Sequence, residues 1–194
     1  SSSSRPGAGC QLPTRAEVTD VANAVFEQTD AIMLSGETTV GKYPVKCIEV
    51  FDRIAQRIER SGGANFFEAA ELTQPRQKVV KSAVVMANEL KAEAILVFTR
   101  HGSMARYAGW LRPRHSKIYG LCAHDAIACG LSLSWGVTPV VIPFDMINPT
   151  NTIDIALGTL VAQGHVKPGD TVVIVSSILV GDQIVDAVQM RVVS

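Results

Sequence analysis

The stretch Ala94-Ile-Leu-Val-Phe98, followed directly by Thr99-Arg-His-Gly-Ser-Met104, decides how most of this 194-residue chain is interpreted. Five consecutive apolar residues that run into polar and glycine residues are typical of a strand buried on both faces of a parallel sheet. Apolar residues recur at helical spacing on either side, over residues 79–90 and 103–111. The pattern predicts a helix, a buried strand, a turn and a second helix.

The same alternation continues to the end of the chain. Further strands are predicted at residues 117–122, 137–142, 171–175 and 187–193, and further helices at residues 125–135 and 151–163. Strands that alternate with helices predict the α/β class, here an open, mostly parallel five-stranded sheet flanked by helices.

The first sixty residues have a different organisation. Thr14-Arg-Ala-Glu17 has the form of a capping box that starts a helix, and Pro44 is placed to open another that runs to residue 58. Between them, Asp30-Ala-Ile-Met-Leu-Ser35 is predicted to be a buried parallel strand. A helix, a strand and a helix cannot close a sheet, so we expect part of a larger unit.

These patterns predict four segments. Residues 1–12 are expected to be a disordered tag, a linker or a truncation scar, and residues 13–60 form the partial unit. The Gly- and Pro-marked stretch over residues 61–75 is a linker, and residues 76–194 form the α/β domain.

Composition excludes several classes of partner. Acidic and basic residues number 18 each, so no overall field attracts nucleic acid or an anionic membrane. The longest apolar run is far shorter than the ~20 residues that a membrane helix needs. The four cysteines form no CxxC pair, which favours reduced thiols and a cytoplasmic location. The histidines do not have the spacing of a metal site.

The turn after the strand at residues 94–98 is a candidate phosphate site. Thr99 and Ser103 offer hydroxyl groups, Arg100 a forked cation, and Gly102 close approach of the backbone, while the amides of Ser103 and Met104 begin a helix. An ordinary strand-to-helix turn, with a glycine for geometry and a serine for capping, explains the same residues.

A second candidate is Ser35-Gly-Glu-Thr38, a polar cluster directly after the strand predicted at residues 30–35. Ser35 and Glu37 lie where a β/α barrel keeps its active site. A loop with a helix cap is the alternative interpretation.

Several blocks resemble pyruvate kinase in order and spacing. They are Pro13-Thr-Arg-Ala-Glu17, Thr19-Asp-Val-Ala-Asn-Ala-Val25, Ile32-Met-Leu-Ser-Gly-Glu-Thr38, Tyr43-Pro44, Trp135-Gly-Val-Thr-Pro139 and Lys167-Pro-Gly-Asp170. The resemblance covers nearly everything after Gln11.

The resemblance implies a remnant of a (β/α)8 barrel, in the order helix, strand and helix, followed by the C-terminal domain of that family. The family converts phosphoenolpyruvate and ADP to pyruvate and ATP, with a catalytic lysine, magnesium and potassium. Neither that lysine nor the acidic metal ligands have a counterpart here, so we expect this chain alone to be inactive and to bind neither ion. By resemblance, Ser35 and Glu37 line the barrel mouth, and residues 99–104 hold a phosphate of an allosteric effector.

Two departures from the family bear on that effector. Members activated by fructose bisphosphate tend to have Ser-Gly-Arg-Ser where this chain has His101-Gly-Ser-Met104. Their Gly-rich loop near the C-terminus is replaced by Val180-Gly-Asp-Gln-Ile-Val-Asp186, in which Asp182 and Asp186 would repel a second phosphate. A monophosphate, or no effector, fits better.

Three functions remain in view. The chain is interpreted first as part of a pyruvate kinase, and alternatively as a free-standing regulatory module that binds a phosphorylated metabolite. The third is a structural assembly piece, because the family forms homo-oligomers, typically tetramers. In that case its partners are other subunits or the remainder of the barrel.

Overall fold

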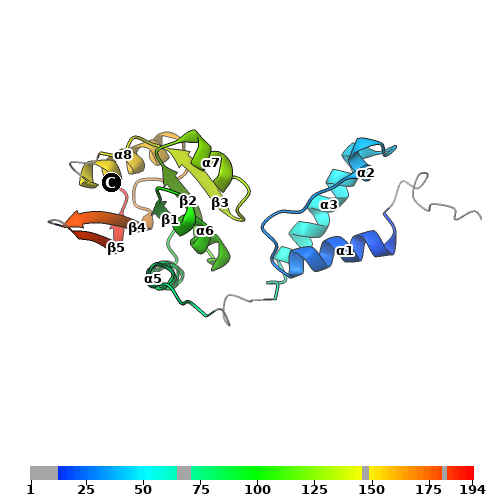
Figure 1. The fold of residues 1–194 in the computed structure, drawn as a ribbon, viewed down its shortest axis with the longest axis horizontal. Helices are drawn as coiled ribbons and strands as arrows, with labels where there is room; N and C mark the ends of the chain where they lie inside the picture. The colour runs from blue at the N-terminus through cyan, green and yellow to red at the C-terminus, as the bar shows by residue number, and fades with distance from the viewer. Residues whose placement is uncertain (1–12, 65–70, 146–148, 181–182) are drawn as a thin grey trace, which may run out of the picture. The chain divides into compact units, whose positions relative to one another are not determined.

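The computed structural model describes residues 13–64, 71–145, 149–180 and 183–194, and the chain divides into two compact units, residues 1–69 and 70–194 (Figure 1). The segment predicted to be a tag or linker, residues 1–12, lies outside the described residues. Each unit is described by itself.

The second unit is built on a five-stranded sheet of order β3-β2-β1-β4-β5. The first four strands are parallel, and β5 pairs antiparallel with β4. The open, mostly parallel sheet predicted from the sequence is therefore confirmed. The strands are β1 (Ala94–Phe98), β2 (Lys117–Cys122), β3 (Val137–Val141), β4 (Thr171–Val180) and β5 (Gln183–Val192).

Strands β4 and β5 are longer than predicted. Their antiparallel ladder runs from Thr171↔Val192 to Val180↔Gln183, whereas β1 pairs with β4 only as far as Val97↔Val175. Beyond that point β4 and β5 pair only with each other. The predicted bounds of 171–175 and 187–193 cover the part of β4 and β5 that belongs to the wider sheet.

Helices cover both faces of this sheet (Figure 1). Helix α8 packs on one face, where Ile153, Ala156 and Leu160 join a cluster with Leu96, Tyr119 and Ile174. On the other face, a Cβ at Gly120 would meet Ala105 of α6 and Leu131 of α7. The helices are α5 (Pro75–Leu90), α6 (Ser103–Trp110), α7 (Asp125–Leu131) and α8 (Pro149–Ala162).

Helix α7 ends earlier than the predicted residue 135. Residues 132–136 form turns instead, and Gly136 has a φ of +68°, a conformation that a helix cannot continue through. This turn also brings the Trp135 carbonyl oxygen within 2.8 Å of where a Cβ of Gly109 would lie. Glycine at position 109 therefore allows α6 to approach the turn.

The first unit consists of α1 (Arg15–Phe26), the short α2 (Gly36–Thr39) and α3 (Pro44–Glu59). The predicted capping box is present, since Thr14 Oγ1 accepts from the Glu17 amide and the Glu17 carboxylate accepts from the Thr14 amide. Pro44 occupies the first turn of α3, as predicted. Helices α1 and α3 contact each other, yet none of the described residues 13–64 is buried.

The strand predicted at residues 30–35 is wrong for this structure, because residues 31–35 have no regular secondary structure. An apolar run becomes a strand only when a neighbour pairs with its backbone. None of the described residues provides such a neighbour. The described part of the first unit thus consists, in chain order, of α1, the unpaired segment at residues 31–35, the short α2 and α3.

No helix within the described ranges is long and apolar enough to span a bilayer.

Candidate functional site

The loop at residues 99–102 lies where the sheet changes direction. From β1 the chain proceeds through β2 to β3 on one side, and then α8 returns it to β4 on the other side of β1. The loop after β1 therefore opens at the point where the connections from adjacent strands diverge. In open α/β sheets, ligands bind outside the carboxyl ends of the strands at such a point.

Thr99 holds this loop in shape. The residue is 4 % exposed, and its amide donates to the Leu121 carbonyl at 2.9 Å. Its Oγ1 accepts the Gly102 amide at 3.0 Å. Gly102 is the N-cap of α6 with a φ of +84°, a conformation that favours glycine. The Thr99 oxygen is thus already an acceptor within the loop, which leaves its hydroxyl hydrogen to donate.

The other predicted residues of the loop are placed unequally. Arg100 is exposed, and Ser103 is half-buried at the first position of α6. The Met104 side chain is buried at 5 % exposure, so it packs in the core and only its backbone amide belongs to the helix start. The loop therefore presents a cation, a hydroxyl group and helix-start amides.

Arg106, Arg112 and Arg114 form a basic cluster after this loop in the sequence, which could steer an anion or make structural ion pairs; of these, Arg106 lies beside the loop. Its Nη2 atom lies 3.5 Å from the position a Cβ would take on Gly102 and 3.7 Å from that on Gly130. The guanidinium is therefore folded back along α6 over the loop. Its spacing of four residues from Gly102, about one helical turn, explains why this arginine of the cluster reaches the loop.

Ser176 lies in the middle of β4, one residue beyond the part of that strand that pairs with β1. It follows Val175, which pairs with Val97 of β1, and it is 5 % exposed. Its hydroxyl oxygen has no hydrogen-bond partner among the described residues. Buried hydroxyl groups normally have a partner, so an unpaired one beside the carboxyl end of β1 is informative. The interruption of an apolar run by Ser176 and Ser177 was its signal in the sequence.

Polar contacts lie in the part of the β4–β5 ladder that extends beyond β1. Ser177 donates to Asp186 Oδ1 at 2.6 Å, and Arg76 Nε lies 3.3 Å from Asp186 Oδ2. Because Val180 pairs with Gln183, only two residues connect the strands. Asp182 is one of them and lies outside the described residues.

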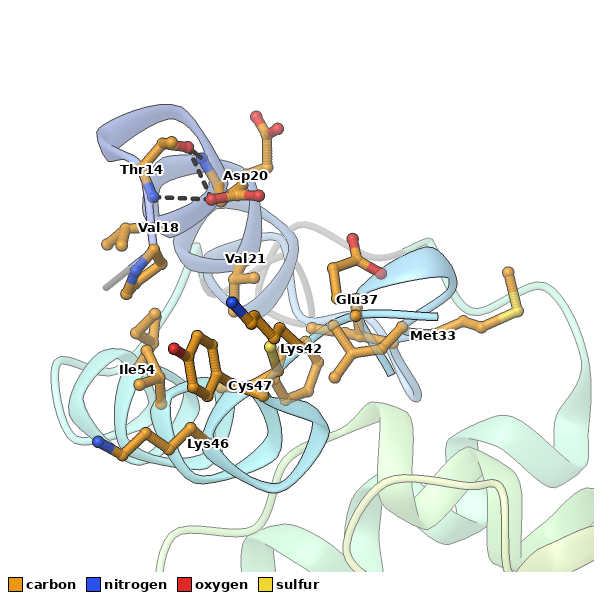
Figure 2. Close-up of a pocket in the computed structure, with 18 residues that line it drawn as sticks. Thr14, Val18, Asp20, Val21, Met33, Glu37, Lys42, Lys46, Cys47 and Ile54 are labelled. Carbon is orange, nitrogen blue, oxygen red and sulfur yellow. Dashed lines mark hydrogen bonds between the residues drawn. The ribbon is translucent and has the colours of Figure 1, made fainter. Parts of the chain in front are cut away.

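The second candidate lies in the first unit, beside a groove of about 490 Å³ between α1 and α3. Figure 2 shows Val18, Val21, Cys47 and Ile54 along this groove. Met33 also borders it, with its side chain extended outward. Glu37 and Lys42 stand at its rim, so the wall is mostly apolar with charges at the edge.

Ser35 and Glu37 are engaged with each other. The Ser35 amide donates to Glu37 Oε2 at 2.8 Å, and the Thr38 and Thr39 hydroxyl groups donate to the Ser35 carbonyl. Hydrogen bonds from the backbone amides of Glu37 and Ser35 lower the pKa of the Glu37 carboxyl. This geometry is that of a helix cap, and the Ser35 side chain does not line the groove.

Magnesium has no evident place in the described part of the chain. Within residues 13–64, 71–145, 149–180 and 183–194, no three His, Cys, Asp or Glu side chains gather as a metal site would require. The described residues therefore do not fit the metal.

Comparison with known proteins assigns both units to one family. Residues 77–189 match the family model described as pyruvate kinase, alpha/beta domain, and residues 9–48 match pyruvate kinase, barrel domain. Pyruvate kinase 2 of Synechocystis is 37 % identical over 171 residues, which are 87 % of this chain and 28 % of the relative.

Two further relatives agree. The chloroplastic pyruvate kinase isozyme G of Ricinus communis is 39 % identical over 174 residues, covering 85 % of this chain and 40 % of the relative. A crystal structure of a Cryptosporidium parvum pyruvate kinase matches with a TM-score of 0.79 at 26 % identity, over 95 % of this chain and 37 % of that chain. The 194 residues thus span between about a quarter and two fifths of these relatives.

Proposed function

Because the chain belongs to the pyruvate kinase family, we propose that it supplies the C-terminal regulatory and assembly domain of such an enzyme together with the end of its barrel. The complete enzyme would convert phosphoenolpyruvate and ADP to pyruvate and ATP with magnesium and potassium. In this proposal the catalytic lysine and the metal ligands come from other parts of the barrel.

The regulatory role centres on an anion site formed by residues 99–104. The observation that carries this proposal is the position of the loop between β1 and β4, where the connections that follow the strands turn to opposite sides of the sheet. The guanidinium of Arg106 lies near Gly102 of this loop. The start of α6 adds backbone donors and a partial positive charge. Across the same edge, the Ser176 hydroxyl has no partner among the described residues.

The ligand would carry one phosphoryl group. Arg76 and Ser177 bind Asp186, so a carboxylate lies in the part of the β4–β5 ladder that extends beyond β1. The two-residue connection between Val180 and Gln183 offers little backbone to enclose a second phosphate. Both features favour a phosphate monoester over a sugar bisphosphate.

A thermal-shift titration tests this site with inorganic phosphate, AMP, glucose 6-phosphate and fructose bisphosphate. Both tryptophans, Trp110 and Trp135, lie in the second unit, so their fluorescence reports the unit that contains the loop. A ligand at a hundredfold excess over its Kd stabilises the folded state by about 2.7 kcal/mol. We expect a saturable rise in Tm with a monophosphate.

Two variants of the loop and one control variant test whether the rise in Tm comes from binding at the loop. Arg106→Ala and Ser103→Ala should abolish the rise, whereas Ser82→Ala should leave it intact, because Ser82 is exposed on α5 and bonds only within its own helix. A rise that survives both loop variants, or no rise with any of the four compounds, would remove the anion site from the proposal.

A free-standing phosphometabolite-binding module is the second candidate function. Its support is that the second unit has its own sheet, helices on both faces and a buried core. The two functions differ in what residues 1–194 contribute to catalysis. Restored turnover of phosphoenolpyruvate and ADP on adding the rest of a pyruvate kinase would favour the first, while the chain alone is expected to give none above buffer.

We also propose that the partners are other copies of the enzyme subunit, since pyruvate kinases are oligomeric. A reducing compartment suits the cysteines: Cys122 is buried, and none of the described cysteines is in a disulfide. Some relatives are named as chloroplastic, so the cytoplasmic location stays a prediction.

A further inference from the structure

The guanidinium of Arg106 lies against two glycines that belong to different helices. Its Nη2 atom is 3.5 Å from the position that a Cβ would take on Gly102 and 3.7 Å from the corresponding position on Gly130. Gly102 is the N-cap of α6, whereas Gly130 lies in the last turn of α7. Because neither residue has a side chain, there is room for the guanidinium between the two helices. We call Gly102 and Gly130 the glycine seat.

Core packing holds the two glycines of the seat in place relative to each other. Leu131 follows Gly130 in the chain and is fully buried. Its Cδ2 atom is 3.3 Å from the Cβ position of Gly102, so the end of α7 packs directly against the cap of α6. On the loop side, Thr99 Oγ1 accepts a hydrogen bond from the Gly102 amide. The seat is therefore part of the folded core of the second unit and not a chance arrangement of surface loops.

The positive charge on the seat is not neutralised by a neighbour. The Arg106 side chain is exposed, and no carboxylate among the described residues forms an ion pair with it. Arg76 and Arg191, by contrast, each bind an aspartate. A guanidinium donates hydrogen bonds from a rigid planar fork, which suits the oxygen atoms of a phosphoryl group. Arg106 is thus placed and charged to meet an anion at the start of α6.

We propose that Gly130 is a positioning residue of the anion site, because its lack of a side chain lets the guanidinium of Arg106 fold back over Gly102. The last turn of α7 supports this placement, since the free carbonyl groups at the end of a helix favour a cation. Position 130 thereby sets the charge that residues 99–104 present, although it does not contact the ligand itself. The inference rests on the phosphate binding proposed for residues 99–104 and adds a residue of α7 to that site.

The first test needs no ligand and follows the Nε–Hε group of Arg106 by ¹⁵N relaxation NMR. Its resonance is identified as the one that Arg106→Lys removes. In the full chain, we expect the order parameter of this group to fall in Gly130→Leu, whose side chain begins 3.7 Å from Nη2 of the arginine. No other described side chain lies within 4 Å of that starting point, so circular dichroism should show an unchanged fold. An unchanged order parameter would overturn the proposal.

A matched pair of variants tests the charge of the seat. Gly130→Glu places a carboxylate within reach of Arg106, and Gly130→Gln places a neutral amide of the same size there. In thermal-shift titrations with inorganic phosphate and with glucose 6-phosphate, Gly130→Glu should raise the Kd by roughly tenfold or more, as the loss of a charged hydrogen bond would. Gly130→Gln should lose clearly less. Gly130→Ala should bind as the wild type does, because a Cβ 3.7 Å from Nη2 makes only an ordinary contact.

The outcomes separate the role of Gly130 from the existence of the anion site. A rise in Tm for the wild type that Gly130→Glu and Gly130→Gln reduce equally, or leave intact, would overturn the role of Gly130 alone. No rise with the wild type would overturn the anion site and this inference together. A selective loss in Gly130→Glu, with a mobile Arg106 in Gly130→Leu, is the result expected if position 130 acts through the arginine.

Discussion

Thr99 shows how one side chain can support a loop and a candidate ligand site together. Its hydroxyl oxygen accepts a hydrogen bond from the Gly102 amide inside the protein. Thr99 therefore stabilises the folded loop whether or not a ligand is bound. A loss of binding in a Thr99 variant would therefore be ambiguous, which is why the phosphate test relies on Arg106 and Ser103.

Replacing Thr99 measures that structural role. Thr99→Val keeps the shape but leaves the buried Gly102 amide without its acceptor, which typically costs about 1–3 kcal/mol. Thr99→Ser keeps the oxygen and should cost clearly less. Urea denaturation followed by tryptophan fluorescence gives both values, and equal losses for the two variants would show that the hydrogen bond contributes little.

Glu37 makes a prediction about pH. Amide hydrogen bonds from Glu37 and Ser35 lower the pKa of the Glu37 carboxyl in the folded chain. A lowered pKa means that the charged carboxylate supports the start of α2 above the ordinary glutamate pKa. That support is lost as the pH falls through the folded value. Carbon-detected NMR should find a lower titration midpoint for Glu37 in the folded chain than in urea, and an equal or higher one would contradict the cap.

Among single residues, the sequence predicted what local chemistry decides. The capping box of Thr14 and Glu17 and the first-turn Pro44 depend only on neighbours in the chain, and both were found. Ser176 gains its interest from β1 and β4 lying side by side, an arrangement that a one-dimensional pattern does not contain. The basic cluster that includes Arg106 is visible in the sequence, whereas the position of its guanidinium near Gly102 and Gly130 is not.

At the scale of elements, close packing on β2 explains why position 120 is a glycine. A Cβ there would lie 3.0 Å from Leu131 Cδ1, 3.1 Å from Val137 Cγ1 and 3.3 Å from Ala105 Cβ. Helices α6 and α7 therefore approach the sheet more closely at this strand than a side chain would allow.

Two glycine-to-alanine substitutions should change stability in opposite directions. Gly120→Ala overpacks the contact with α6 and α7 and should destabilise the second unit by about 1–3 kcal/mol. Gly158→Ala adds a methyl group within α8 where no atom lies within 4 Å, and should stabilise by about 0.5–1 kcal/mol. The midpoints of urea denaturation compare the stabilities of the two variants with that of the wild type. The packing argument fails if Gly120→Ala leaves the stability unchanged.

The strands illustrate which elements a sequence can predict. β1 and the first half of β4 are apolar runs that end up inside a complete sheet, so pattern and structure agree. The run at residues 30–35 has the same pattern but no neighbour among the described residues, and it forms no strand. Strand formation depends on partner strands as well as on composition. This explains why β1 and β4 form strands whereas residues 30–35 do not.

At the scale of the whole molecule, the two units differ in how much they bury. The second unit has fully buried residues such as Leu96, Tyr119 and Ile174, whereas the described residues 13–64 include none. Burial of apolar area is the main stabilising contribution to folding, so the first unit should be the weaker.

Heating should therefore give two transitions. Circular dichroism at 222 nm should lose the signal of α1 and α3 at a temperature where the fluorescence of Trp110 and Trp135 is still unchanged, because both tryptophans belong to the second unit. Coincident curves from the two probes would indicate one cooperative unit instead.

The outer strands of the sheet carry one more consequence, for growth into fibres. Edge-to-edge addition needs a long strand with free backbone groups, and β5, with ten residues, is such an edge. The opposite edge, β3, has five residues and includes Pro139, which has no amide hydrogen. Two molecules that met through β5 would expose only β3 edges, so polymerisation along the sheet would stop at the pair.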